Sequence, residues 1–117
     1  MTNDQKINYL EMPAKDLKLA EKFYSETFGW TFTWFGDEYL AFNDGDMDGG
    51  FFKSELCSST ENGATLIVLF AEDLEGTMEK VLGNGATLVK EIISFPGGRR
   101  FQFADPNGNE LAVWSDK

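Results

Sequence analysis

The sequence predicts an α+β fold in which two βαβββ modules follow one another within a single domain, residues 1–117. The predicted elements occur twice in the order strand, helix, strand, strand, strand. The halves also match in sequence: AKDL, which begins at Ala14, recurs as AEDL 57 residues later, and YLAFNDGDMDGGFF, which begins at Tyr39, lies over RFQFADPNGNELAV 61 residues later. Such a repeat indicates two copies of one unit. We place module one at about residues 6–56 and module two at about residues 64–115.

In module one, the apolar segment INYLEM (residues 7–12) predicts a strand that ends at Pro13, because proline gives a sheet no hydrogen-bond donor. A helix follows, since Asp16 can cap its start, Gly29 can end it, and apolar residues recur between them at helical spacing. The segments WTFTWF, YLAF and GGFFK predict three strands joined by the turns GDE and NDGDMD.

Module two repeats this order after a polar stretch, residues 54–63. TLIVLF predicts its first strand, and a helix begins near Asp73 and ends at Gly83 and Gly85. The segments ATLVKEI, RRFQFA and NELAVW predict three further strands, with FPGG and DPNG as turns. The side chains that we expect to face the helices are Ile67, Leu69, Leu111 and Val113.

The acidic run DGDMDGGFFKSE, which begins at Asp44, has the residue spacing of a calcium-binding loop. A calcium loop of that kind lies between two helices, whereas this run occupies the place that ADPNGNE takes in the other module. We therefore interpret it as a turn between two strands.

Composition limits the functions open to the chain. Its 20 acidic and 10 basic residues give a net charge of −10, which disfavours nucleic acid and anionic membranes as partners. It has no histidine, the commonest general base and transition-metal ligand. One cysteine, Cys57, excludes an intramolecular disulfide. Because no apolar run approaches the ~20 residues of a membrane span and MTNDQK is not typical of a signal peptide, we expect a cytoplasmic protein.

The tandem modules, the junction MPAKDLKLAEKFYSETFGW and the closing DPNGNELAVW together resemble the vicinal oxygen chelate superfamily. That superfamily includes glyoxalase I, ring-cleaving dioxygenases and bleomycin-resistance proteins. The resemblance covers nearly the whole chain and implies a curved, cup-like mixed sheet, with helices outside and a ligand inside the cup.

Metal enzymes of that superfamily carry ligands, usually His, Glu or Gln, at four inward positions on the first and last strand of each module. The resemblance maps these positions onto Tyr9, Phe51, Leu66 and Ala112, with room for a slip of one residue in either module. None of the four is a strong metal ligand, so we expect neither a metal nor another cofactor. A hard divalent ion held by carboxylates such as Glu11 and Glu110 is the alternative.

We expect the cup to be lined mainly by aromatic and apolar side chains, joined by two carboxylates. Period-two alternation puts Glu11 on the face of Tyr9, and Glu110 on the face of Ala112 and Trp114. The predicted ligand-binding residues are Tyr9, Glu11, Trp34, Phe51, Leu66, Phe70, Arg100, Glu110, Ala112 and Trp114. The alternative is that the carboxylates lie at the rim, solvated or paired with an arginine, and that most of the aromatic residues are core.

These features favour a metal-independent, homodimeric protein that sequesters or senses an aromatic or cationic small molecule in the cup. Aromatic walls can stack on a ligand ring and attract a cation. The first alternative is a metal-dependent lyase, isomerase or dioxygenase with unusual ligands. The second is a non-catalytic interaction module whose strand edges pair across a homodimer.

Overall fold

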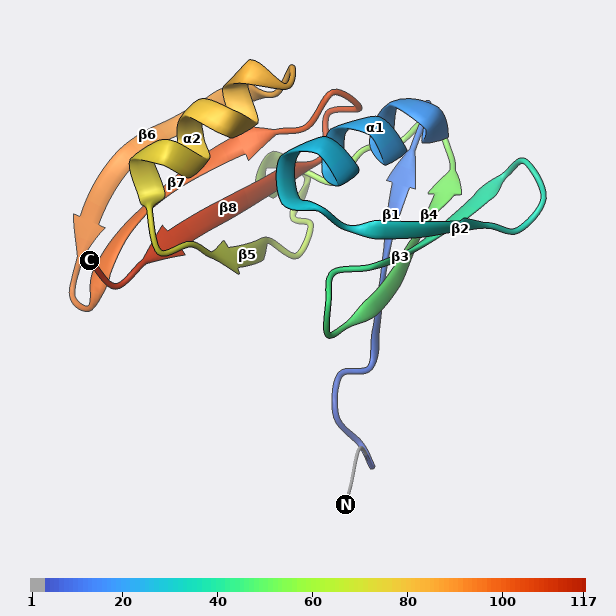
Figure 1. Ribbon diagram of the computed structural model, residues 1–117, viewed down its shortest axis with the longest axis horizontal. Helices are drawn as coiled ribbons and strands as arrows, with labels where there is room; N and C mark the ends of the chain where they lie inside the picture. The colour runs from blue at the N-terminus through green and yellow to red at the C-terminus, as the bar shows by residue number, and fades with distance from the viewer. Residues whose placement is uncertain (1–3) are drawn as a thin grey trace.

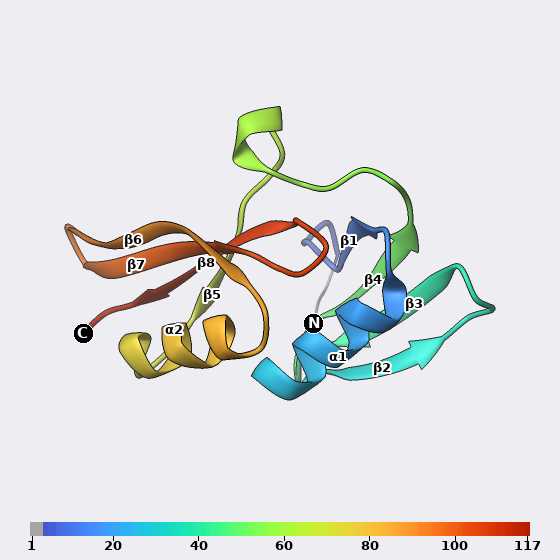
Figure 2. The ribbon, with the colours of Figure 1, turned by 90° about the horizontal axis from the view of Figure 1, so that it is seen from above.

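The computed structural model describes residues 4–117 and confirms an α+β fold of two βαβββ modules (Figure 1). Module one consists of β1 (Tyr9–Ala14), α1 (Leu17–Phe28), β2 (Thr31–Trp34), β3 (Tyr39–Asn43) and β4 (Asp48–Lys53). Module two consists of β5 (Ile67–Phe70), α2 (Leu74–Gly83), β6 (Thr87–Phe95), β7 (Gly98–Ala104) and β8 (Glu110–Ser115). The linker between them contains a short 3₁₀ turn, η1 (Thr60–Asn62), and arches outward between the modules (Figure 2). Within the described residues, no helix is long and apolar enough to cross a membrane.

The strands form two separate four-stranded mixed sheets rather than one continuous sheet. Their orders are β1-β4-β3-β2 and β5-β8-β7-β6. In each sheet the first strand of the module runs parallel to the last, and the other neighbours are antiparallel. Both helices lie on the same side of the sheets (Figure 1), which we call the helix face. The opposite side is the open face, where alternate side chains of each strand point.

The first helix has the predicted ends, and the second has the predicted start. The side chains of Asp16 and Asp73 each accept a hydrogen bond from a backbone N–H in the first turn of α1 and α2, at 3.1 and 3.0 Å. Gly29 ends α1 with a φ of 74°, the left-handed conformation that glycine adopts without a steric penalty. Gly83 is the last residue of α2, and Asn84 caps it.

Pro13 lies inside β1 instead of ending it, which corrects the predicted strand over residues 7–12. Because β1 is an edge strand that pairs only with β4, it tolerates a residue without an N–H. The carbonyl of Pro13 accepts a hydrogen bond of 2.7 Å from Nδ2 of Asn109.

The acidic run begins in the turn between β3 and β4 and continues as β4, so no helix precedes or follows this turn. Oδ1 of Asp44 accepts hydrogen bonds from the backbone N–H groups of Asp46 and Met47, at 2.9 and 2.7 Å. The carboxylate thus closes the turn itself, as Asp commonly does at the first position of a turn.

One hydrophobic core on the helix face joins the two modules. Tyr24 of α1 stacks on Trp30 with ring centroids 4.7 Å apart, and Phe23 reaches Phe103 of β7 at 6.0 Å. Leu111 and Val113 are fully buried in this core, and Ile67 and Leu69 pack against it. The predicted helix-facing positions of module two are therefore confirmed.

The DPNG turn between β7 and β8 fastens module two to the start of α1. Nδ2 of Asn107 donates to the carbonyl of Asp16, and Oδ1 of Asn107 accepts from the N–H of Asp16, both at 2.9 Å. Fully buried Asn109 donates to Pro13 and accepts from the N–H of Ser58 in the linker. A single turn therefore holds module one, the linker and module two together.

Candidate functional site

A cavity of about 340 Å³ lies where β1 of module one meets the starts of β5 and β8 of module two. We call it the junction cavity. Its lining residues are Tyr9, Leu10, Glu11, Met12, Ser58, Thr65, Ile67 and Glu110. It brings together three predicted site residues that come from opposite ends of the chain, Tyr9, Glu11 and Glu110.

On the module one side, Glu11 belongs to a chain of hydrogen bonds that begins at Tyr9. Oη of Tyr39 donates to Oε2 of Glu11 at 2.9 Å and lies 2.6 Å from Oη of Tyr9. Burial, reinforced by these hydrogen bonds, raises the pKa of Tyr39, so its hydroxyl keeps its proton. Since that proton is directed at Glu11, the hydroxyl of Tyr9 is the donor to Tyr39.

Tyr39 is not among the site residues predicted from the sequence, although a glycine in β4, Gly50, is a signal for it. Gly50 lies beside Glu11 in the sheet, and a Cβ at this position would collide with the phenol of Tyr39. A glycine within a strand often marks the close approach of another group. Here the missing side chain leaves room for the Tyr39 ring to cross β4 and reach Glu11.

On the module two side, Glu110 is a buried and ionised carboxylate. Its Oε1 accepts from the N–H and the hydroxyl of Thr60, at 2.8 and 2.9 Å, and its Oε2 accepts from Nε2 of Gln102. Burial alone raises the pKa of Glu110, but these hydrogen bonds and the positive charge of Lys90 outweigh it and lower the pKa. The carboxylate of Glu110 is therefore a negative charge held in one position in the lining of the cavity.

The lowered pKa of Glu110 predicts a contribution to acid stability. A carboxyl whose pKa is lower in the folded state stabilises the protein above its unfolded pKa of about 4.5, and the contribution is lost as the pH falls through the lower folded value. We expect chemical denaturation to show that the stability difference between wild type and Glu110→Gln narrows as the pH falls from 6 to below 4. A difference that stays constant over this range would contradict the prediction.

Two predicted site residues lie on the helix face, which corrects their assignment. Phe51 is fully buried, with its ring 5.3 Å from that of Tyr24 on α1. The register of β1 with β4 places Gly50, not Phe51, on the open face with Glu11, a slip of one residue from the predicted position. Trp34 also points toward α1, where its Nε1 donates to Glu21 at 3.4 Å.

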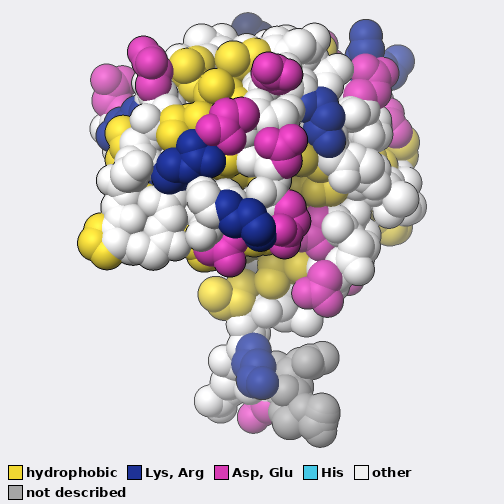
Figure 3. Space-filling view, turned by 60° about the vertical axis from the view of Figure 1, so that its left-hand side comes forward, with side chains coloured by type: hydrophobic (Ala, Val, Ile, Leu, Met, Phe, Trp, Pro, Cys, Tyr) yellow, Lys and Arg dark blue, Asp and Glu magenta, His cyan; other side chains and the backbone are white. Residues whose placement is uncertain are grey.

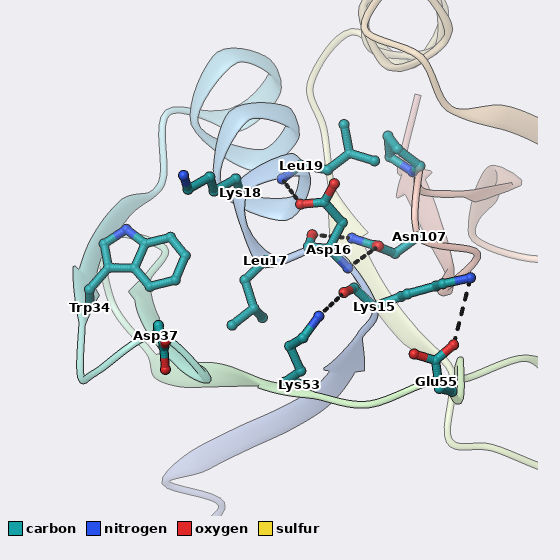
Figure 4. Close-up of a pocket in the computed structure, with 11 residues that line it drawn as sticks. Lys15, Asp16, Leu17, Lys18, Leu19, Trp34, Asp37, Lys53, Glu55 and Asn107 are labelled. Carbon is teal, nitrogen blue, oxygen red and sulfur yellow. Dashed lines mark hydrogen bonds and ion pairs between the residues drawn. The ribbon is translucent and has the colours of Figure 1, made fainter.

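Trp34 contributes to a different and larger cavity of about 640 Å³ at the start of α1 (Figure 4). Three lysines line it, but three carboxylates balance their charge, and Asp16 already caps the helix end. Lys15 pairs with Glu55, and Nζ of Lys53 donates to the carbonyl of Lys15. The lining of this hollow therefore has no single charge sign, unlike that of the junction cavity.

The remaining predicted site residues lie on module two outside the lining of the junction cavity. Phe70 and Trp114 are in edge-to-face contact, with ring centroids 5.2 Å apart, and Arg100 pairs with Trp114 in the sheet register and donates to Gln102 at 3.0 Å. Ala112 is fully buried and offers a ligand no surface. Leu66 is half-buried and immediately precedes β5. The ten predicted residues therefore lie in three places: the junction cavity, the helix face of module one, and the part of module two outside the cavity lining.

The sequence model for the Glyoxalase/Bleomycin resistance protein/Dioxygenase superfamily matches residues 6–113. The chain belongs to this superfamily. A glyoxylase-like domain-containing protein of Didymella fabae is 35% identical over 118 residues, which cover 92% of this chain and 91% of that protein.

Solved structures share the fold of this chain at low sequence identity. A glyoxalase-related enzyme from Fulvimarina pelagi has a TM-score of 0.78 and 17% identity, covering 95% of this chain and 88% of its own. The fosfomycin resistance protein FosX from Listeria monocytogenes, solved with Mn(II) and 1S,2S-dihydroxypropylphosphonic acid, has a TM-score of 0.77 and 17% identity, covering 93% and 88%.

The metal that some superfamily members hold does not fit the residues present here. With the corrected register, the four ligand positions are occupied by Tyr9, Gly50, Leu66 and Ala112, which offer one phenol between them. Among residues 4–117, no three acidic or cysteine side chains gather closely enough to hold an ion. Both oxygens of Glu110 already accept hydrogen bonds from protein groups.

Proposed function

We propose that this protein binds a small molecule in the junction cavity without a metal ion, and thereby sequesters or senses it. The observation that carries the proposal is the cavity itself, which lies at the meeting point of the two modules and combines apolar side chains with fixed carboxylates. Its volume of about 340 Å³ is near the lower end of the range for small-molecule sites, about 300 to 1,000 Å³.

Metal independence rests on the chemistry of the four strand positions. A catalytic metal needs several strong ligands and an open coordination position. A glycine, a leucine and an alanine at three of the four positions cannot supply these ligands. Elemental analysis of protein purified without an affinity tag should therefore find no stoichiometric iron, zinc, nickel or manganese. One equivalent of any of them would overturn this part of the proposal and favour a metal-dependent enzyme.

A thermal-shift screen of small aromatic and cationic compounds tests ligand binding directly. We expect a saturable rise in Tm with a compound that fits the cavity, because binding to the folded state stabilises it. Tyr9→Ala should abolish that rise, since Tyr9 forms one wall of the cavity. Phe35→Ala is the matched control, because Phe35 is an exposed aromatic residue outside the cavity lining. A rise that survives Tyr9→Ala would place the ligand elsewhere.

We also propose that a second copy of the chain covers the open face of module two. Exposed apolar side chains on this face include Val68, Phe70, Ile93 and Phe95. The same face carries Lys90 and Arg100, while its Glu110 is already bonded within the chain. Figure 3 shows acidic, basic and hydrophobic side chains intermingled on the face of the molecule that it presents. The apolar contact at this face would have to outweigh the repulsion between two chains of net charge −10.

Light scattering after size exclusion tests this homodimer. We expect the wild type to have twice the monomer mass and Phe70→Lys to shift toward monomer, since a charge would replace an apolar contact. Phe35→Lys changes another exposed ring, outside that face, and should leave the mass unchanged. A wild-type protein that is monomeric at high concentration would contradict the proposal.

A further inference from the structure

The charged side chains that line the junction cavity have one sign. Glu11 of β1 and Glu110 of β8 both line it, and among the described residues no lysine or arginine does. The remaining lining side chains are neutral, from Tyr9, Ser58 and Thr65 to the apolar Leu10, Met12 and Ile67. Lys90 acts on Glu110 from outside the lining, but an anion inside the cavity would meet two carboxylates and no lining cation, so the electrostatics favour a cation or a neutral molecule.

The hydrogen bonds around Glu11 leave one strong acceptor free. The proton of Tyr39 is committed to Oε2 of Glu11, and the proton of Tyr9 is committed to Tyr39. Within residues 4–117, no group donates to Oε1 of Glu11. The hydrogen-bond chain therefore fixes the carboxylate from one side and leaves its other oxygen available to a ligand, which must supply the donor.

Glu110 adds charge rather than a free acceptor. Thr60 and Gln102 already donate to its two oxygens, which keeps the carboxylate in place with 7% of the residue exposed. A positive group near Glu11 would thus sit within the field of a second carboxylate that cannot turn away. Ionic hydrogen bonds of this kind are stronger than neutral ones, although water at the exposed Glu11 screens part of the attraction.

We propose that the junction cavity takes the protonated amino group of a small organic amine, which donates to Oε1 of Glu11 and lies within the field of Glu110. This inference rests on the proposed function, because it names the ligand class for the same cavity. The apolar part of the amine lies against Met12 and Ile67. A primary ammonium fits better than a quaternary one, since it supplies both the charge and the N–H donors that the free oxygen requires.

Isothermal titration calorimetry with three probes of one shape tests the inference. Benzylamine carries charge and donors, benzyltrimethylammonium carries charge without N–H donors, and benzyl alcohol carries a donor without charge. We expect benzylamine to bind with a Kd at least about tenfold lower than that of either of the others. Its binding should also weaken as the salt concentration rises. Equal affinity for benzylamine and benzyl alcohol would overturn the inference.

Glu11→Gln should raise the Kd for benzylamine by about tenfold or more, because it removes the charge while keeping the shape of the side chain. Glu38→Gln is the matched control, since it removes the same charge from an exposed position outside the cavity lining. Equal effects of the two variants would mean that only the overall charge matters and would overturn the assignment of Glu11. Circular dichroism verifies that both variants are folded.

The two proposals fail in distinguishable ways. If benzylamine does not bind while another compound raises the Tm and loses this effect in Tyr9→Ala, the ammonium assignment is wrong and small-molecule binding stands. If neither benzylamine nor any compound of the thermal-shift screen binds, both proposals are wrong.

Discussion

Phe51→Ala is expected to destabilise the fold by about 3 to 5 kcal/mol, the usual cost of deleting a buried phenyl ring from a core. The ring of Phe51 is fully buried between those of Tyr24 and Phe42, at centroid distances of 5.3 and 5.4 Å. Its removal leaves a cavity in the cluster that joins α1 to the sheet of module one. Urea denaturation monitored by circular dichroism measures the free energy of unfolding.

Phe52→Ala is the matched control for that prediction, because Phe52 is the next residue of the same strand and points to the open face, where it is 37% exposed. We expect it to cost about 1 kcal/mol or less. Equal losses in the two variants would contradict the corrected orientation of β4. Since the sequence predicts that Phe51 faces the ligand cup, this pair of variants also tests the correction of that prediction.

The second large effect is expected for Asp105→Ala at the contact between the modules. Asp105 is 4% exposed and accepts three hydrogen bonds, from the hydroxyl of Tyr24 at 2.7 Å and from the N–H groups of Asn107 and Asn109 at 2.8 and 3.0 Å. Alanine leaves all three donors without this acceptor, so we expect a loss of about 3 to 5 kcal/mol.

Tyr24→Phe removes only one of these hydrogen bonds and keeps the aromatic packing, so it should cost about 1.5 to 3 kcal/mol in the same denaturation experiment. Asp46→Ala serves as a control, because Asp46 is an exposed carboxylate in the turn between β3 and β4. A loss for Asp105→Ala no larger than that for Asp46→Ala would show that the carboxylate does not hold the modules together.

The fold could be predicted because local signals agreed with the internal repeat. The caps at Asp16 and Asp73 and the alternation in β5 and β8 each mark one element, and the repeat sets their order. The prediction that the first strand ends at Pro13 was wrong because β1 lies at a sheet edge, where proline is tolerated. Which strand lies at an edge depends on tertiary pairing, which the sequence of one strand does not show.

The site was harder to predict because it depends on register and on the meeting of two modules. Alternation in β4 alone cannot tell whether Gly50 or Phe51 faces the ligand side, and a slip of one residue exchanges the faces. Glu11 and Glu110 were assigned to the ligand side from alternation, but their shared cavity arises only where β1 approaches β5 and β8. Tyr39 reaches the site because its ring occupies the space that a side chain at Gly50 would fill. The sequence pattern does not show that these two residues are neighbours.

The contacts of the turn at Asn107 and Asn109 imply that the covalent connection between the modules is not what keeps them together. These two side chains bind Asp16, Pro13 and Ser58 directly, and the aromatic core continues across the same contact. A chain cut by a protease within the exposed linker should therefore migrate as one particle in a native gel, and its two fragments should separate only in denaturant.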